Sequence, residues 1–195
     1  MRLFVAIYPP KEVLDHVRDT LRQLDKEKRN IIPVPLDQIH FTLRFVGLNT
    51  SISSKQKLAK ELLKFSGNYP KPMLNLGKFS LGFPGQHHPR AMFFDLEDID
   101  PLEDLVNVVH KRIREVGAKD TILWKDRDDR DFHITIARLK QSSVTNSGIH
   151  RVKELIETVK MPAPPSFVPT EMYLVQSDVP RVGGPVYKRL ERIVL

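Results

Sequence analysis

Two short segments of the chain repeat one pattern, and both contain side chains that can transfer a proton. His-Phe-Thr-Leu at residues 40–43 returns as His-Ile-Thr-Ile at residues 133–136, again within an apolar run. Because alternate side chains of a β-strand lie on the same face, His40 is predicted to share a face with Thr42. His133 is predicted to share a face with Thr135 in the same way. Each segment would therefore present one imidazole and one hydroxyl together.

These groups suit displacement at a phosphodiester. An imidazole titrates near neutral pH, so His40 and His133 could act together as one general base and one general acid. Hydrolysis needs both, because one group deprotonates the attacking water while the other protonates the departing oxygen. Hydroxyl donors from Thr42 and Thr135 would stabilise the charge that develops on the non-bridging oxygens.

Two arginines near the motifs are candidates to hold the phosphate, because a guanidinium can bind it through two hydrogen bonds. Under strict alternation Arg44 shares the face of His40 and Thr42, and it is the weaker candidate. Arg138 falls on the face opposite His133, so its role requires a β-bulge or a twist. Neither motif has the histidine and carboxylate spacing of a zinc site, so we expect no metal and no cofactor.

Simpler explanations exist for each feature taken alone. A single His-x-Thr is common in strands, but two copies in matching contexts argue against coincidence. The adjacent pair His87 and His88 is more typical of a solvated loop than of a metal site. Trp124 and Phe132 flank a charged segment, residues 125–131, and could stack on a nucleobase, although single aromatic residues more often belong to a core.

The composition limits the class of protein. The chain has 195 residues, 41% of them hydrophobic, and no cysteine, which excludes disulfides, thiolate metal sites and a cysteine nucleophile. The net charge of +7 favours an anionic partner. The first apolar run is too short for a signal peptide, and no stretch approaches the ~20 apolar residues of a membrane span. We expect a cytoplasmic monomer that does not bind membranes.

The predicted elements follow a repeated order. The first half contains a strand at 3–8, a helix at 11–28, the first motif strand ending at Gly47, a helix around 58–65 and a hairpin of 73–83 with 91–96. A helix at 101–116, the second motif strand, a helix at 149–159 and a hairpin of 171–175 with 186–194 follow. We therefore predict an α+β fold over residues 1–195 with two pseudo-symmetric lobes, each an antiparallel sheet with helices on its outer face. The active-site groove would lie between the lobes.

The paired motifs resemble those of the 2H phosphoesterase superfamily. Further matches are the starting segment at residues 4–7, the segment at 43–47, Phe83 with Pro84, and Tyr187. The resemblance covers essentially the whole chain. Within the superfamily the sequence is most similar to the bacterial and archaeal RNA 2′,3′-cyclic phosphodiesterases, also called 2′-5′ RNA ligases.

The resemblance implies metal- and ATP-independent opening of a 2′,3′-cyclic phosphate, on RNA 3′ ends or nucleotides, to a 2′-phosphate, with 2′-5′ ligation as the reverse reaction. It implies that His40 protonates the leaving 3′-oxygen, that His133 activates water, and that Thr42, Thr135 and Arg138 hold the phosphate. The reversed histidine roles remain open. Two other functions remain open as well: hydrolysis of small cyclic nucleotides or 2′,5′-oligoadenylate, and nucleotide or RNA binding without turnover.

Overall fold

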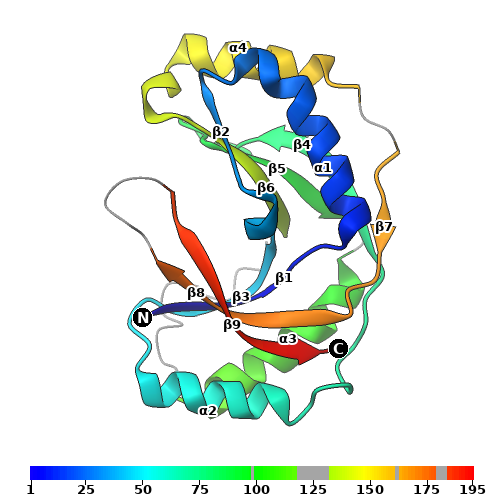
Figure 1. Ribbon diagram of the computed structural model, residues 1–195, viewed down its shortest axis with the longest axis vertical. Coiled ribbons are helices and arrows are strands. Elements are labelled where there is room, and N and C mark those ends of the chain that lie inside the picture. Colours follow the sequence, from blue (N-terminus) through cyan, green and yellow to red (C-terminus); the bar gives the residue numbers. More distant parts are fainter. Residues whose placement is uncertain (98, 118–131, 161–162, 179–183) are drawn as a thin grey trace.

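The computed structural model describes residues 1–97, 99–117, 132–160, 163–178 and 184–195. Within them the chain forms two antiparallel sheets flanked by helices (Figure 1), which confirms the predicted α+β class. Trp124 and the charged segment 125–131 lie outside the described residues, so the structure places neither.

The first sheet contains the first motif strand and both chain-terminal strands. Its order is β3-β1-β8-β9, with β1 (Arg2–Ile7), β3 (Phe41–Gly47), β8 (Glu171–Asp178) and β9 (Val186–Val194). Along β1, alternate residues face opposite ways: Leu3 and Val5 belong to the main hydrophobic core, whereas Phe4 and Ala6 form a separate cluster with Val175. Apolar residues of β1 are therefore buried on both faces of this sheet.

The second sheet contains the second motif strand and the central hairpin. Its order is β2-β6-β5-β4-β7, with β2 (Ile31–Pro33), β4 (Leu74–Leu81), β5 (Ala91–Glu97), β6 (His133–Leu139) and β7 (Ser166–Phe167). The proline-containing β2 lies at the edge of the sheet, where a missing N–H is tolerated. Gly82, with φ of 73°, begins the hairpin turn, and a Cβ there would lie 2.2 Å from that of Pro89.

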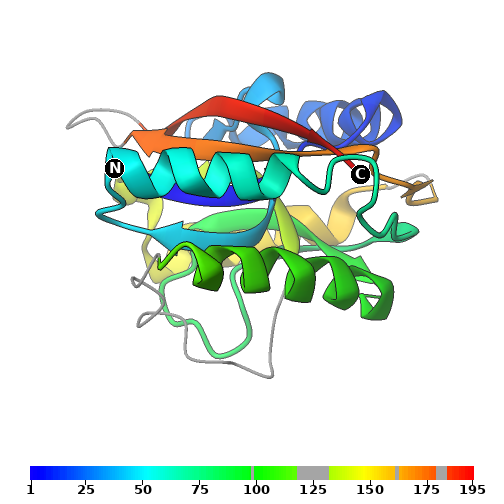
Figure 2. The same ribbon diagram turned by 90° about the horizontal axis from the view of Figure 1, so that it is seen from below.

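In the described part of the chain, helices pack on both sheets (Figures 1 and 2). The helices are α1 (Lys11–Gln23), α2 (Ile52–Leu63), α3 (Asp100–Glu115) and α4 (Asn146–Thr158). Contacts of α3 with β3 and of α2 with β9 place both on the first sheet, while α4 contacts β4 on the second. Helix α1 also packs on the second sheet, where its His16 ring lies 5.3 Å from the Phe94 ring of β5. The end of the predicted first helix is a separate 3-10 turn, η1 (Leu24–Glu27).

Helices α2 and α4 each begin at a residue whose side chain caps the helix. The Ser51 hydroxyl accepts a hydrogen bond from the backbone N–H of Ser54 at 3.0 Å, which caps α2. The Thr145 hydroxyl accepts a hydrogen bond from the backbone N–H of Gly148 at 3.1 Å, which caps α4. Helix α3 is followed by Gly117, whose φ of 66° suits the left-handed end of a helix.

The lobes do not correspond to the two halves of the sequence. The β4–β5 hairpin follows the first motif but pairs with β6, the second motif strand. The β8–β9 hairpin follows the second motif but pairs with β1, next to β3. Helices α1 and α3 are exchanged between the sheets as well. Each lobe is thus assembled from both halves, and the strands β3 and β6 are in contact across the lobes.

Candidate active site

The second motif presents its polar side chains on one face of β6. Ile134 and Ile136 are fully buried, whereas His133 and Thr135 are half-buried on the opposite face. The imidazole of His133 lies against the rings of Phe83 and Phe93, with centroids 5.0 Å away in each case. These rings belong to the β4–β5 hairpin, so the exchanged hairpin forms the wall behind the second histidine.

A β-bulge in β6 places Arg138 on the same face as His133. In the pairing with β5, Thr135 lies opposite Phe93 and Ala137 opposite Met92, so Ile136 is the extra residue. An extra residue reverses the alternation of side chains beyond it. Ala137 is therefore buried, and Arg138 is half-buried on the His133 face. This is the irregularity that a phosphate-binding role for Arg138 requires.

The first motif strand is bulged at the equivalent position. In the pairing with β1, Thr42 lies opposite Ala6 and Arg44 opposite Val5, so Leu43 is the extra residue. The side chain of Arg44 consequently lies on the core face and is 9% exposed. The assignment of Arg44 to the face of His40 and Thr42 is wrong, because strict alternation does not hold in this strand.

Aromatic rings surround the first histidine, His40, immediately before β3. Its imidazole centroid lies 5.1 Å from that of Phe4, 5.6 Å from Tyr8 and 4.5 Å from Tyr187. Its Nδ1 atom lies 2.7 Å from the backbone oxygen of Gln38. A carbonyl can only accept, so Nδ1 carries the proton and Nε2 has the free lone pair in the neutral form.

The surroundings of His40 favour its neutral form. Burial lowers the pKa of the imidazole to about 4, against the opposing effect of the hydrogen bond to Gln38, and electrostatic interactions with Arg138, His133 and Arg189 also lower this pKa. At neutral pH the free protein therefore holds His40 uncharged, with Nε2 ready to accept a proton. His133 and Arg138, which act on this pKa, belong to β6 of the other sheet, and β6 is in contact with β3.

The two strands that carry the motifs, β3 and β6, are in contact, and His133 and Arg138 act electrostatically on His40. His40 and Thr42 come with β3, while His133, Thr135 and Arg138 come with β6. The Thr42 side chain is exposed and that of Thr135 is half-buried. Two imidazoles, two hydroxyls and one guanidinium can together transfer protons and bind an anion.

Arg189 is a charged residue of this region that the sequence interpretation missed. Its guanidinium carbon lies 3.7 Å from the ring centroid of Tyr8 and 5.3 Å from that of Tyr173. Its Nη2 donates a hydrogen bond to the backbone oxygen of Asp37 at 2.9 Å. The alternation of Tyr187 and Arg189 on the last strand is a signal for a shared face. That signal is informative only once β9 is known to belong to the sheet of the first motif.

Phe132, the described member of the proposed stacking pair, is a core residue. It is 6% exposed and belongs to the main hydrophobic cluster, so the structure contradicts a stacking role and supports core packing. His87 and His88 lie in the exposed β4–β5 loop, as expected for a solvated pair. Across the described part of the chain, no three His, Asp or Glu side chains lie close enough together to hold a metal ion.

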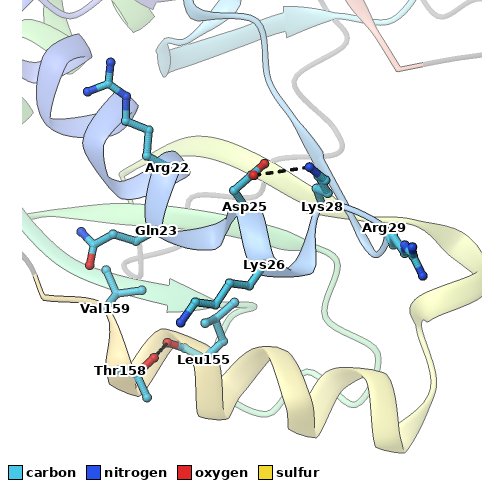
Figure 3. A pocket seen from close by; sticks show the side chains of 9 residues that line it. All are labelled: Arg22, Gln23, Asp25, Lys26, Lys28, Arg29, Leu155, Thr158 and Val159. Atoms are coloured by element: carbon cyan, nitrogen blue, oxygen red, sulfur yellow. Dashed lines mark hydrogen bonds and ion pairs between the residues drawn. The ribbon is translucent and has the colours of Figure 1, made fainter.

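Two cavities lie in different parts of the molecule. One, of about 460 Å³, is lined by Tyr8, Tyr173 and Arg189 and lies next to His40. The other, of about 730 Å³, lies between η1 and α4 and contains none of the motif residues. Figure 3 shows that its basic side chains do not converge, because Arg22 and Arg29 point away from each other.

None of the described helices is long and apolar enough to cross a membrane.

Comparison with known proteins gives matches among solved structures alone. No protein-family model and no curated protein sequence matches the chain. TT0787 of Thermus thermophilus superposes with a TM-score of 0.69 at 24% identity, covering 100% of this chain and 98% of that one. A protein described as a phosphoesterase superposes with a TM-score of 0.64 at 21% identity, and the alignment covers 100% of this chain and 98% of that protein.

LigT of E. coli, in its apo form, has a TM-score of 0.66 and 20% identity, and the alignment covers 99% of this chain and 96% of LigT. Other LigT structures are complexes with NADP⁺, 3′-AMP, ATP and phosphate. At these identities the matches show a common fold. The chain therefore has the fold of TT0787, this phosphoesterase and LigT, over nearly the whole length of each.

Proposed function

We propose that the chain is a 2H phosphoesterase that hydrolyses the terminal 2′,3′-cyclic phosphate of RNA to a 2′-phosphate, without metal or ATP. One observation carries this proposal: the strands β3 and β6 are bulged at the same motif position and are in contact, and His133 and Arg138 act electrostatically on His40. The fold shared with a phosphoesterase and with nucleotide complexes of LigT supports it.

The reaction is an in-line displacement at phosphorus. One imidazole takes a proton from water as the new P–O bond forms, and the other gives a proton to the 3′-oxygen as the P–O3′ bond breaks. Thr42, Thr135 and the Arg138 guanidinium would donate to the non-bridging oxygens, where negative charge increases. No nucleotide is needed to drive ligation, because the strained cyclic ester supplies the energy for attack by a 5′-hydroxyl in place of water.

The electrostatics of His40 bear on which histidine is the acid. The low pKa of His40 leaves it unprotonated in the free protein at neutral pH, which suits a base. The acid role implied by family resemblance requires proton uptake, and a bound phosphate anion favours it by stabilising the imidazolium. The two assignments therefore differ in whether substrate binding must change the charge of His40.

Two alternative functions make different use of the same residues. A hydrolase of small cyclic nucleotides or 2′,5′-oligoadenylate would keep the catalytic groups and differ in the neighbouring cavity. A binding module without turnover would gain little from two histidines suited to opposite proton transfers.

A substrate panel distinguishes these functions. Wild-type protein and His133→Ala are incubated in EDTA with RNA bearing a 2′,3′-cyclic phosphate, with ADP-ribose cyclic phosphate and with 2′,5′-oligoadenylate. We expect turnover of the RNA, lost in the variant. Preferential turnover of either small substrate would favour the first alternative, and binding without any turnover would favour the second.

A further inference from the structure

The cavity beside His40 has the composition of a nucleoside site. It has a volume of about 460 Å³ and is formed by the end of β1, the start of α1, the turn before His40 and the segment before β8. Its apolar walls include Pro9, Leu14, Leu36 and Val168. Walls of this kind, with a few polar groups at fixed positions, are typical of small-molecule sites.

Tyr8 and Arg189 belong both to this cavity and to the surroundings of His40. The Tyr8 ring lies 5.6 Å from the imidazole of His40, and Tyr8 also lines the cavity. The charge of Arg189 acts on His40, and Arg189 also lines the cavity. Tyr8 and Arg189 therefore connect the cavity with the surroundings of His40.

The guanidinium of Arg189 is held in place before any ligand binds. It stacks 3.7 Å above the Tyr8 ring, and the Asp37 backbone oxygen accepts one of its five N–H groups. A fixed guanidinium loses little side-chain entropy when it binds an anion. Its remaining donors are suited to phosphate oxygens.

The Tyr8 hydroxyl is a second donor that needs an acceptor. It is buried and, within the described residues, no group accepts a hydrogen bond from it. The neighbouring Arg189 guanidinium can only donate. Burial raises the pKa of this phenol, so it remains protonated and can donate. A buried donor without an acceptor is costly and commonly indicates a missing ligand or water.

The two carboxylates that line the cavity, Asp37 and Glu171, do not repel an anion to the same extent. Glu171 forms an ion pair with Arg192 and accepts the Tyr173 hydroxyl, which neutralises it locally. Asp37 remains, and its carboxylate can accept from a ribose hydroxyl or a base amino group. The cavity thus combines the donors of Tyr8 and Arg189 with the Asp37 acceptor and apolar walls.

We propose that Arg189 and the Tyr8 hydroxyl form a second phosphate subsite, and that the cavity behind them holds the penultimate nucleoside of the RNA. The phosphate bound there is the phosphodiester that joins the terminal nucleotide to the preceding one. This inference rests on the proposed function and extends it: the enzyme distinguishes the end of a chain from a free mononucleotide.

The test compares two substrates with the same reacting group. One is a nucleoside 2′,3′-cyclic phosphate with a free 5′-hydroxyl, and the other is a dinucleotide with that nucleoside at its 3′ end. The readout is the ratio of their kcat/KM values. An effect of Arg189 on His40 changes both substrates alike and leaves this ratio unaltered, so the ratio isolates the subsite.

We expect the wild-type protein to favour the dinucleotide by at least about tenfold, which corresponds to one charge-assisted phosphate contact of about 1.4 kcal/mol. Arg189→Gln should bring the ratio close to one, and Tyr8→Phe should lower it in the same direction. Lys188→Gln is the matched control, because Lys188 is an exposed neighbour on β9 that does not line the cavity. It removes the same charge and should keep the wild-type ratio.

The possible failures are distinct. A wild-type ratio near one, or an equal loss for both substrates in Arg189→Gln, would overturn the subsite while leaving the proposed function intact. Turnover of neither substrate by the wild-type protein would overturn the proposed function, and the subsite inference with it.

Discussion

Gln38 connects the first histidine to the last strand of the chain. Its backbone oxygen lies 2.7 Å from Nδ1 of His40, and its side-chain oxygen accepts the backbone N–H of Tyr187 at 2.7 Å. The Tyr187 ring in turn lies 4.5 Å from the imidazole. The turn η2 (Leu36–Gln38) is therefore fixed to β9, and with it the tautomer and orientation of His40.

Gln38→Leu should reduce kcat by roughly tenfold with little change in KM, because it removes the acceptor that fixes the turn while keeping a side chain of similar size. Gln38→Glu keeps an acceptor and should recover most of the rate. Steady-state kinetics tests this. Gln176→Leu is the control, because the Gln176 side chain donates a hydrogen bond only to the exposed Asp178 among the hydrogen bonds of the described residues. A Gln38→Leu enzyme with wild-type kcat would show that the hydrogen bond between the Gln38 side chain and Tyr187 is not needed to position His40.

Protein stability should fall as the pH is lowered from 7 to 5, in part because of His40. Its pKa is about 4 in the folded protein and about 6.5 when unfolded, so the unfolded chain binds more protons in this range. This difference costs about 2 kcal/mol at pH 5 relative to pH 7. Urea unfolding at both pH values measures it.

His40→Gln should lack that part of the pH dependence. His87→Gln, which alters an exposed loop histidine, should retain it. Equal pH dependence in the wild-type protein and His40→Gln would contradict the low pKa of His40.

Arg138→Gln should lower kcat/KM by about 10²-fold, because the β6 bulge brings this guanidinium to the face of His133. Arg138→Lys should recover only part of the loss, since an ammonium does not bind phosphate through two parallel bonds. Because the Arg138 charge lowers the pKa of His40, its removal should also raise that pKa, measurable by NMR titration.

Arg151→Gln is the control for this charge change, as Arg151 is exposed on α4. If Arg138→Gln matched this control in both kinetics and titration, Arg138 would have no part in the site.

His40→Ala and His133→Ala should each reduce kcat by at least ~10²-fold while the protein stays folded. The wild-type pH profile of kcat/KM should be bell-shaped, and each variant should lose one limb. Loss of the low-pH limb in His40→Ala would identify His40 as the base, and loss of the high-pH limb would identify it as the acid. Circular dichroism of both variants controls for folding.

The sequence could predict the motif faces because His40 with Thr42, and His133 with Thr135, are separated by one strand period. It could not predict which side Arg44 and Arg138 take, because the bulges at Leu43 and Ile136 arise from strand pairing. Local alternation is a property of a single strand, whereas a bulge depends on the neighbouring strand as well.

The exchange of hairpins between the two sheets could not be predicted from the sequence, for a related reason. The order of elements repeats along the chain, but it does not say which sheet a hairpin joins. Without that pairing, Arg189 on β9 had no visible connection to His40, although the chain brings them to one region. Long-range pairing therefore decided both of the differences that matter for the site.

The most direct test of the central claim uses an RNA oligomer ending in a 2′,3′-cyclic phosphate. The purified protein is incubated with it in EDTA and without ATP, and the terminal phosphate of the product is identified. We predict a 2′-phosphate, formed by the wild-type protein and absent with His133→Ala. A 3′-phosphate product, a requirement for a divalent metal, or undiminished turnover by His133→Ala would contradict the two-histidine mechanism.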